Sequence, residues 1–250
     1  MFAQDDIDRL KEKETAHDNC LTCHGRDNTC QSFKDVIWET RKIAANIKIK
    51  YRDYTLDGLK DVPKGLKKDI QHYLDDLAQK KKKGAGLLLL GNPGTAKSSI
   101  AYIVLMAAIK LDYTVYATSI SDYMKIIGNS IHGDTQEMEN AKDKLYEISK
   151  VDFLLLDDIG REFRDKYGFI DATIMEIIRS RADDNLPTII TTNSISEQDF
   201  SKNDLRLASI IKEQYTPFKF SGPDYRNKIA KVVRAEYEEK NKENTTETPQ

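Results

Sequence analysis

Eight consecutive residues have the types and spacing of a phosphate-binding loop. The run from Gly91 to Ser98 reads Gly-Asn-Pro-Gly-Thr-Ala-Lys-Ser and fits the pattern G-x-x-x-x-G-K-[ST] except at Ala96, where glycine is usual. In such a loop, backbone N–H groups and the N-terminus of the following helix surround a polyphosphate. The residues expected to contact the nucleotide are Asn92, Pro93, Gly94, Thr95, Ala96, Lys97, Ser98 and Ser99.

Two side chains of this loop carry the expected chemistry. Lys97 would reach the outer phosphates as a point charge, and the Ser98 hydroxyl would bind Mg²⁺. The methyl group of Ala96 fits the loop if its φ is negative, because glycine is the residue that adopts positive φ without strain. The surrounding sequence supports the prediction, since an apolar run precedes the loop and a helical pattern follows it.

Polar side chains at the ends of two other apolar runs complete the predicted site. Asp157 and Asp158 follow Val151–Leu156, and Asn193 ends the run that begins at Thr188. Asp157 would hold the Mg²⁺ shell beside Ser98, and Asp158 would polarise the attacking water. Asn193 would orient that water. Together these residues predict a hydrolytic nucleotide site.

A second group of residues has the types that bind a metal. Cys20 and Cys23 form a Cys-x₂-Cys pair, and Cys30 follows as a third thiol. Either His17 or His24 could complete a tetrahedral structural zinc site, and we favour His17 because His24 lies directly beside Cys23. The alternative is a metal-free loop with ordinary thiols.

The charge balance limits the classes of partner. The 250 residues contain 39 Lys+Arg against 41 Asp+Glu, a formal net charge of −2, so nucleic-acid binding requires a local patch. The four lysines at 80–83 are such a patch or simply a solvated helix end. Apolar runs of about 18 residues and the apolar segment of a signal peptide are both missing. We therefore expect a cytoplasmic protein without a membrane partner.

Alternation and periodicity predict the elements that position these residues. Apolar or β-branched runs predict strands at 85–90, 113–118, 151–156 and 188–193, and a short extended segment is expected at 216–220. Helical spacing predicts helices at 4–16, from 31 onwards, and at 64–80, 99–108, 122–127, 136–149, 169–184 and 204–215. We expect Ser121 to cap the helix at 122–127 and the polar stretch 128–135 to connect it to the next one. The aromatic residues of 51–59 are interpreted as packing anchors.

Taken in order, these motifs resemble a single AAA+ ATPase domain. The resemblance rests on Gly91–Ser98, Phe153–Asp158, Thr191–Asn193, Arg206 and Arg226, and it covers about residues 50 to 235. Within that superfamily, the Asp-Asp-Ile-Gly and Ile-Ile-Thr-Thr-Asn sequences are similar to the bacterial helicase loaders of the DnaC/DnaI type and to the related IstB-type transposition ATPases. The loop departs from the loader pattern at Ala96, where it resembles the phosphate loop of MCM helicases instead.

The resemblance implies roles for two arginines. Arg206 falls where the family places the arginine finger that enters a neighbouring subunit's site, and Arg226 falls where the family places its second sensor. Arg179 and Arg181 are competing candidates. By the same resemblance, Asp158 is the catalytic carboxylate and Asn193 the first sensor.

The family also implies a fold and a function. We expect an α/β fold, with a five-stranded parallel sheet flanked by helices in an AAA+ domain at 51–237. A small cysteine-containing module at 1–50 would precede it, and the tail at 238–250 should be disordered because no apolar residue follows Tyr237. The implied function is an ATP- and Mg²⁺-dependent, self-associating loader that delivers a replicative hexameric helicase onto single-stranded DNA. The alternatives are a transposition helper on duplex DNA and a nucleotide-gated adaptor with little turnover.

Overall fold

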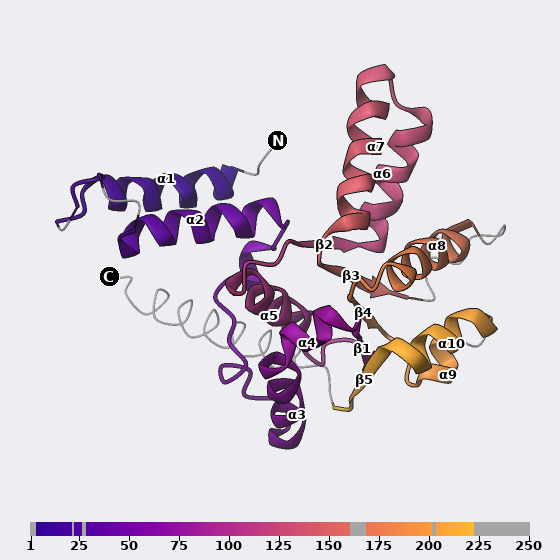
Figure 1. Cartoon of the computed structure of the whole chain (residues 1–250). Coiled ribbons are helices and arrows are strands. Elements are labelled where there is room, and N and C mark those ends of the chain that lie inside the picture. The colour runs from indigo at the N-terminus through magenta and orange to yellow at the C-terminus, as the bar shows by residue number, and fades with distance from the viewer. Residues whose placement is uncertain (1–3, 22, 27–28, 161–168, 202–203, 223–250) are drawn as a thin grey trace, which may run out of the picture.

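Five strands form one parallel sheet in the order β2-β3-β4-β1-β5 (Figure 1). The computed structural model of the chain describes residues 4–21, 23–26, 29–160, 169–201 and 204–222. The strand bounds are Gly86–Gly91 (β1), Val115–Ser119 (β2), Phe153–Ile159 (β3), Thr188–Thr192 (β4) and Tyr215–Phe220 (β5). This sheet confirms the predicted five-stranded parallel α/β fold.

Helices cover both faces of the sheet (Figure 1). Their bounds are Gln4–Asp18 (α1), Gln31–Ala44 (α2), Lys64–Asp75 (α3), Leu77–Lys82 (α4), Lys97–Lys110 (α5), Ile120–His132 (α6), Thr135–Lys150 (α7), Phe169–Asp183 (α8), Glu197–Ser201 (α9) and Leu205–Gln214 (α10), with a 3₁₀ turn at Ile49–Tyr51 (η1). In the part of the chain that the structure describes, no helix is long and apolar enough to cross a membrane. The predicted disordered tail, 238–250, lies outside the described residues.

The strand side chains alternate between two apolar cores, one on each face of the sheet. Leu87 and Leu89 pack on one side with α3 and α5, whereas Leu88 and Leu90 pack on the other with α6, α8 and α10. All four leucines of β1 are fully buried. Burial on both faces explains why the strand reads as an unbroken apolar run rather than an alternating one.

The hairpin of α6 and α7 differs from its predicted form. The prediction that Ser121 caps α6 is wrong, because the cap is Ser119, whose backbone is still extended at the end of β2 and whose hydroxyl accepts the Asp122 N–H. The helix then continues through Gly128 to His132, so most of the predicted connection is helical. Asp134 caps α7 by accepting the Glu137 N–H, which confines the connection to two residues, Gly133 and Asp134.

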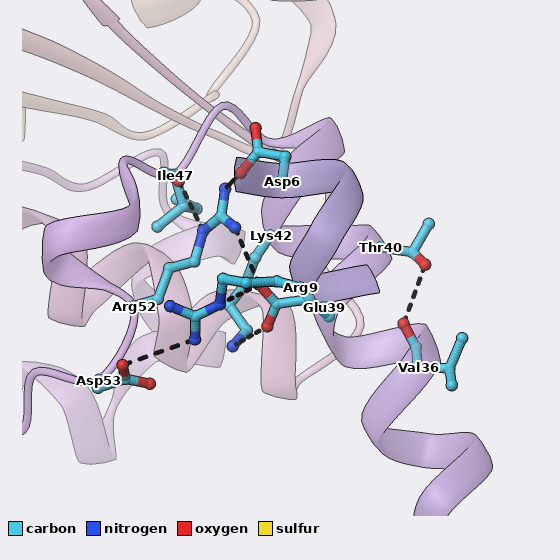
Figure 2. Close-up of polar contacts among 9 residues, drawn as sticks. All are labelled: Asp6, Arg9, Val36, Glu39, Thr40, Lys42, Ile47, Arg52 and Asp53. Carbon is cyan, nitrogen blue, oxygen red and sulfur yellow. Dashed lines mark hydrogen bonds and ion pairs between the residues drawn. The ribbon is translucent and has the colours of Figure 1, made fainter. Parts of the chain in front are cut away.

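A buried ion cluster joins the N-terminal helices to the rest of the chain (Figure 2). Arg52 lies just after η1 and is 5% exposed. Its guanidinium donates to the Ile47 carbonyl oxygen at 2.9 Å and to Glu39 Oε1 at 2.9 Å, and it lies 2.6 Å from Asp6 Oδ1. One arginine therefore contacts α1, α2 and the segment that follows them.

Glu39 is the central anion of this cluster. Its carboxylate is 1% exposed and pairs with Lys42 Nζ at 2.8 Å and with Arg9 Nε at 3.4 Å, in addition to Arg52. Burial alone would raise the pKa of Glu39, but the Lys42 ammonium, with Arg52 and Arg9, holds that pKa below its usual value. Three cations around one buried carboxylate are stable only while the carboxylate is charged.

We expect Glu39→Gln to lower the free energy of unfolding by about 3 kcal/mol at pH 7, because it leaves buried cations without their shared anion. The folded pKa of Glu39 is depressed, so its contribution is complete above the unfolded pKa of about 4.3 and is lost as the pH falls through the folded value. Urea unfolding of both proteins between pH 7 and pH 3 measures this difference. Exposed Glu139→Gln on α7 is the control. A deficit for Glu39→Gln that stays constant with pH would contradict this account.

Candidate nucleotide site

The loop from Gly91 to Lys97 connects β1 directly to α5 and folds as a tight turn. Gly91 and Gly94 have φ values of 135° and 76°. A Cβ on Gly91 would collide with the carbonyl oxygen of Phe220, so this position requires glycine. Thr95 Oγ1 donates to the Asn92 carbonyl oxygen at 2.8 Å and closes the turn. The first N–H groups of α5 therefore open toward the loop, as a bound polyphosphate requires.

Ala96 adopts a left-handed backbone, with φ 70° and ψ 13°. The condition under which a methyl group fits the loop without strain, a negative φ, is therefore not met. The residue is the N-cap of α5, and the loop must reverse direction there to enter the helix, which is why glycine is usual at this place in the pattern. A non-glycine residue in this region costs about 1–2 kcal/mol.

Lys97 lies at the mouth of the loop and is 7% exposed. Its ammonium donates to the carbonyl oxygens of Gly91 and Asn92, both at 2.7 Å, and to Asn193 Oδ1 at 3.2 Å. The last contact connects the loop after β1 to the end of β4. The predicted phosphate-binding lysine and the predicted sensor asparagine thus lie side by side.

The acidic pair at the end of β3 contacts the phosphate loop that follows β1, although β4 lies between these two strands. Ser98 Oγ donates to Asp157 Oδ1 at 2.8 Å, and Asp157 is 6% exposed. Asn193 Nδ2 donates to Asp158 Oδ1 at 3.2 Å. The structure therefore brings together Lys97, Ser98, Asp157, Asp158 and Asn193, which the sequence singled out from three separate segments.

Thr191 also belongs to this group, although no sequence motif marks it as a site residue. Its hydroxyl donates to Asp157 Oδ1 at 2.7 Å and accepts the Asp158 N–H at 2.7 Å. A threonine inside Thr188–Thr192 reads as an ordinary strand residue. The available signal was its position, two residues before Asn193 at the end of the same run.

A cavity of about 990 Å³ opens above these side chains. The loop, Asp157, Asp158, Thr191 and Asn193 line one side of it, and residues from 48 to 62 line the other. Tyr51 of that segment stacks on Tyr102 of α5, with ring centroids 4.3 Å apart. The interpretation of these aromatic residues as packing anchors is therefore incomplete, because Tyr51 and Tyr54 also line the cavity.

The arginines considered for roles in the site differ in their burial and contacts. Arg206 is exposed in the first turn of α10 and is not among the residues that line the cavity. Arg181 is fully buried and donates to the carbonyl oxygens of Ser149, Val151 and Pro187 at 2.9–3.0 Å, so it cannot reach a neighbouring subunit. Arg179 is exposed on α8. Arg226 lies outside the described residues.

Three of the predicted metal ligands converge between α1 and α2. His17 Nδ1 lies 3.4 Å from Cys30 Sγ and 3.9 Å from Cys23 Sγ, and the two sulfur atoms are 3.4 Å apart. The edges of a tetrahedral zinc site with sulfur and nitrogen ligands measure about 3.5–3.8 Å, so this group fits a zinc ion. His17, rather than His24, belongs to it. Cys20 Sγ is outside the group in which all ligand atoms lie within 4.8 Å of one another.

Comparison with known proteins agrees with this geometry. The family described as IstB-like ATP binding protein matches residues 63–215. The replicative helicase loader DnaC of Escherichia coli (strain K12) is 26% identical over 114 residues, which are 46% of this chain and 44% of DnaC. The chain thus spans less than half the length of this curated relative.

Solved structures share the fold. The crystal structure of the DnaC helicase loader has a TM-score of 0.59 at 21% identity and covers 70% of this chain and 100% of that one. The crystal structure of DnaI has a TM-score of 0.55 at 20% identity and covers 71% of this chain and 93% of that one. These similarities confirm the predicted AAA+ fold and the resemblance to loaders and IstB-type ATPases.

The strain at Ala96 gives a stability prediction. Ala96→Gly should raise the free energy of unfolding by about 0.5–1 kcal/mol, because relief of the left-handed strain exceeds the entropy that glycine adds to the unfolded chain. The control is Ala172→Gly at an exposed position of α8, where the same change should lower stability by about 1 kcal/mol. Equilibrium denaturation measures both. Destabilisation of similar size in the two variants would show that Ala96 is not strained.

Proposed function

Given that the chain belongs to the family of IstB-like ATP binding proteins, we propose that it binds and hydrolyses ATP with Mg²⁺ and uses this cycle to load a replicative hexameric helicase onto single-stranded DNA. The observation that carries the catalytic part is the 2.8 Å hydrogen bond between Ser98 and Asp157, which joins the phosphate loop to the acidic pair. The similarity to DnaC supports the loading part.

Each side chain of the site has a different role in hydrolysis. Loop N–H groups and Lys97 hold the phosphates, and Ser98 with Asp157 would hold Mg²⁺, which supplies positive charge to the β- and γ-phosphates when bound. Asp158 accepts a proton from the water that attacks the γ-phosphorus, and the bond to the bridging oxygen of ADP breaks. Asn193, held between Lys97 and Asp158, orients the water and the carboxylate.

We assign Arg206 to a neighbouring copy's site. It is exposed, and it does not line the cavity of its own subunit. An arginine supplied in trans would stabilise the charge that develops on the transferred phosphoryl group, so turnover would require ATP-dependent self-association. Arg226 remains the proposed second sensor.

We assign the N-terminal helices a role in binding the helicase, with a structural zinc ion held by His17, Cys23 and Cys30. Cys20 would supply the fourth ligand from the adjacent turn. The Ser32 hydroxyl lowers the pKa of the Cys30 thiol, against the effect of burial. Cys30 also caps α2 by accepting the Phe33 N–H, so one thiol belongs to both the ligand group and the helix end.

Two alternatives rest on specific observations. The family match favours a transposition helper that assembles on duplex DNA. The left-handed backbones of Ala96 and Asp158 favour a nucleotide-gated adaptor with little turnover, because strain at both positions can misplace the catalytic groups.

The enzymatic proposal predicts different effects for two substitutions. Lys97→Ala should abolish nucleotide binding, because the outer phosphates lose their only lysine from the loop. Asp158→Asn should keep nucleotide binding and reduce turnover by about 100-fold or more. Fluorescent-nucleotide titration and phosphate release measure the two quantities, with exposed Asp69→Asn as the control. Equal turnover in Asp158→Asn and wild type would support the adaptor instead.

The loading proposal is tested with the hexameric replicative helicase of the source organism. The full chain with ATP should form a complex with the helicase and stimulate its loading onto circular single-stranded DNA. Arg206→Ala should retain ATP binding and lose stimulation by at least about tenfold. Filaments on duplex DNA, without a helicase complex, would contradict loading and favour the transposition helper.

The zinc proposal predicts about one equivalent of zinc per chain in metal analysis of the purified protein. His17→Ala and Cys30→Ser should each reduce this content strongly. His24→Ala is the matched control, because His24 is exposed and lies outside the ligand group. Less than about half an equivalent in the wild-type chain, or equal loss in both histidine variants, would refute the site.

A further inference from the structure

Thr191 occupies a special position between the two aspartates. It is 1% exposed, and its hydroxyl both donates to the Asp157 carboxylate and accepts the Asp158 backbone N–H, each at 2.7 Å. A single oxygen atom therefore fixes a side chain and a backbone position on the neighbouring strand. Ser98 of α5 donates to the same carboxylate oxygen, Asp157 Oδ1.

The strand pairing shows why this hydroxyl is needed. Residues Leu156 and Ile190 pair regularly, and pairing resumes at Ile159 and Thr192. Two residues of β3, Asp157 and Asp158, thus lie opposite one residue of β4, Thr191, which is the arrangement of a β-bulge. Since the regular ladder is interrupted there, the Thr191 side chain accepts an N–H that the backbone of β4 does not.

The bulge determines where the two carboxylates point. In a regular strand, consecutive side chains point to opposite faces of the sheet. Asp158 instead has φ 62°, and both Asp157 and Asp158 line the same cavity. Asp157 contacts Ser98 and Asp158 contacts Asn193, so the bulge lets two adjacent residues serve one site.

We propose that Thr191 is a positioning residue that holds Asp157 and Asp158 in this bulge, so that one can face the metal and the other the attacking water. The inference rests on the proposed ATP hydrolysis. It assigns the geometry of the bulge to one hydroxyl group, because a methyl group in its place, as in valine, would fill the same space but could neither donate to Asp157 nor accept the Asp158 N–H.

The test compares substitutions that separate the hydroxyl from the volume of the side chain. Thr191→Val keeps the shape and removes the hydroxyl, whereas Thr191→Ser keeps the hydroxyl. Thr192→Val is the matched control, because Thr192 is equally buried on β4 and its hydroxyl contacts Ser194 rather than an aspartate. The readouts are kcat and KM for ATP, the ATP affinity with and without Mg²⁺, and thermal stability.

We expect Thr191→Val to lower kcat by at least about tenfold and to weaken the Mg²⁺-dependent gain in ATP affinity, with metal-free ATP binding within about threefold of wild type. Thr191→Ser should restore both quantities, and Thr192→Val should leave them unchanged. Wild-type kcat in Thr191→Val, or an equal loss in Thr192→Val, would overturn the assignment.

A failure of the proposed function is distinguishable from a failure of this inference. If the wild-type chain binds ATP without hydrolysing it, hydrolysis is refuted, and the Mg²⁺ dependence of ATP affinity still tests Thr191. In that case, the inference predicts a smaller Mg²⁺ effect in Thr191→Val than in Thr191→Ser. An equal Mg²⁺ effect in both variants would overturn it.

Discussion

The position of β4 between β1 and β3 is the constraint on which the whole site depends. It separates the phosphate loop from the acidic pair by two strand spacings, about 10 Å. The helix α5 crosses most of this distance, because it packs on β4 and β3 as well as on β1, and the Ser98–Asp157 hydrogen bond closes the remaining gap. Asn193, which follows β4, contacts both the phosphate loop and the acidic pair, since it bonds to Lys97 and to Asp158. The order of the strands therefore explains why polar residues gather at the end of this central strand.

The same site contains two residues with strained backbones. One wall of its cavity is also in contact with the segment that holds the N-terminal helices. Ala96 and Asp158 are both non-glycine residues with positive φ, and each costs about 1–2 kcal/mol that the two apolar cores must offset. On the opposite wall of the cavity, Tyr51 stacks on α5, while the next residue, Arg52, binds Glu39 and Asp6. The docking of α1 and α2 and the shape of the cavity thus depend on one short segment.

The sequence predicted most of the fold because its signals were local. The apolar runs identified four of the five strands, and the polar ends of two of these runs identified Asp157, Asp158 and Asn193. It did not predict features that depend on how segments meet. The sign of φ at Ala96 was left open, because the direction of the loop follows from packing against β5. Thr191 was missed because the bulge exists only once β3 pairs with β4. Arg52 was missed for the same reason, since its partners are distant in the chain.

A crystal structure of the chain with Mg²⁺ and a non-hydrolysable ATP analogue tests the central claim most directly. The β- and γ-phosphates should lie in the loop at 91–98, with Mg²⁺ on Ser98 Oγ and Asp157 beside it. Asp158 and Asn193 should face the γ-phosphate, and Thr191 should still contact both aspartates. Phosphates bound outside the loop, or an Asp158 carboxylate turned away from the γ-phosphate, would contradict the account.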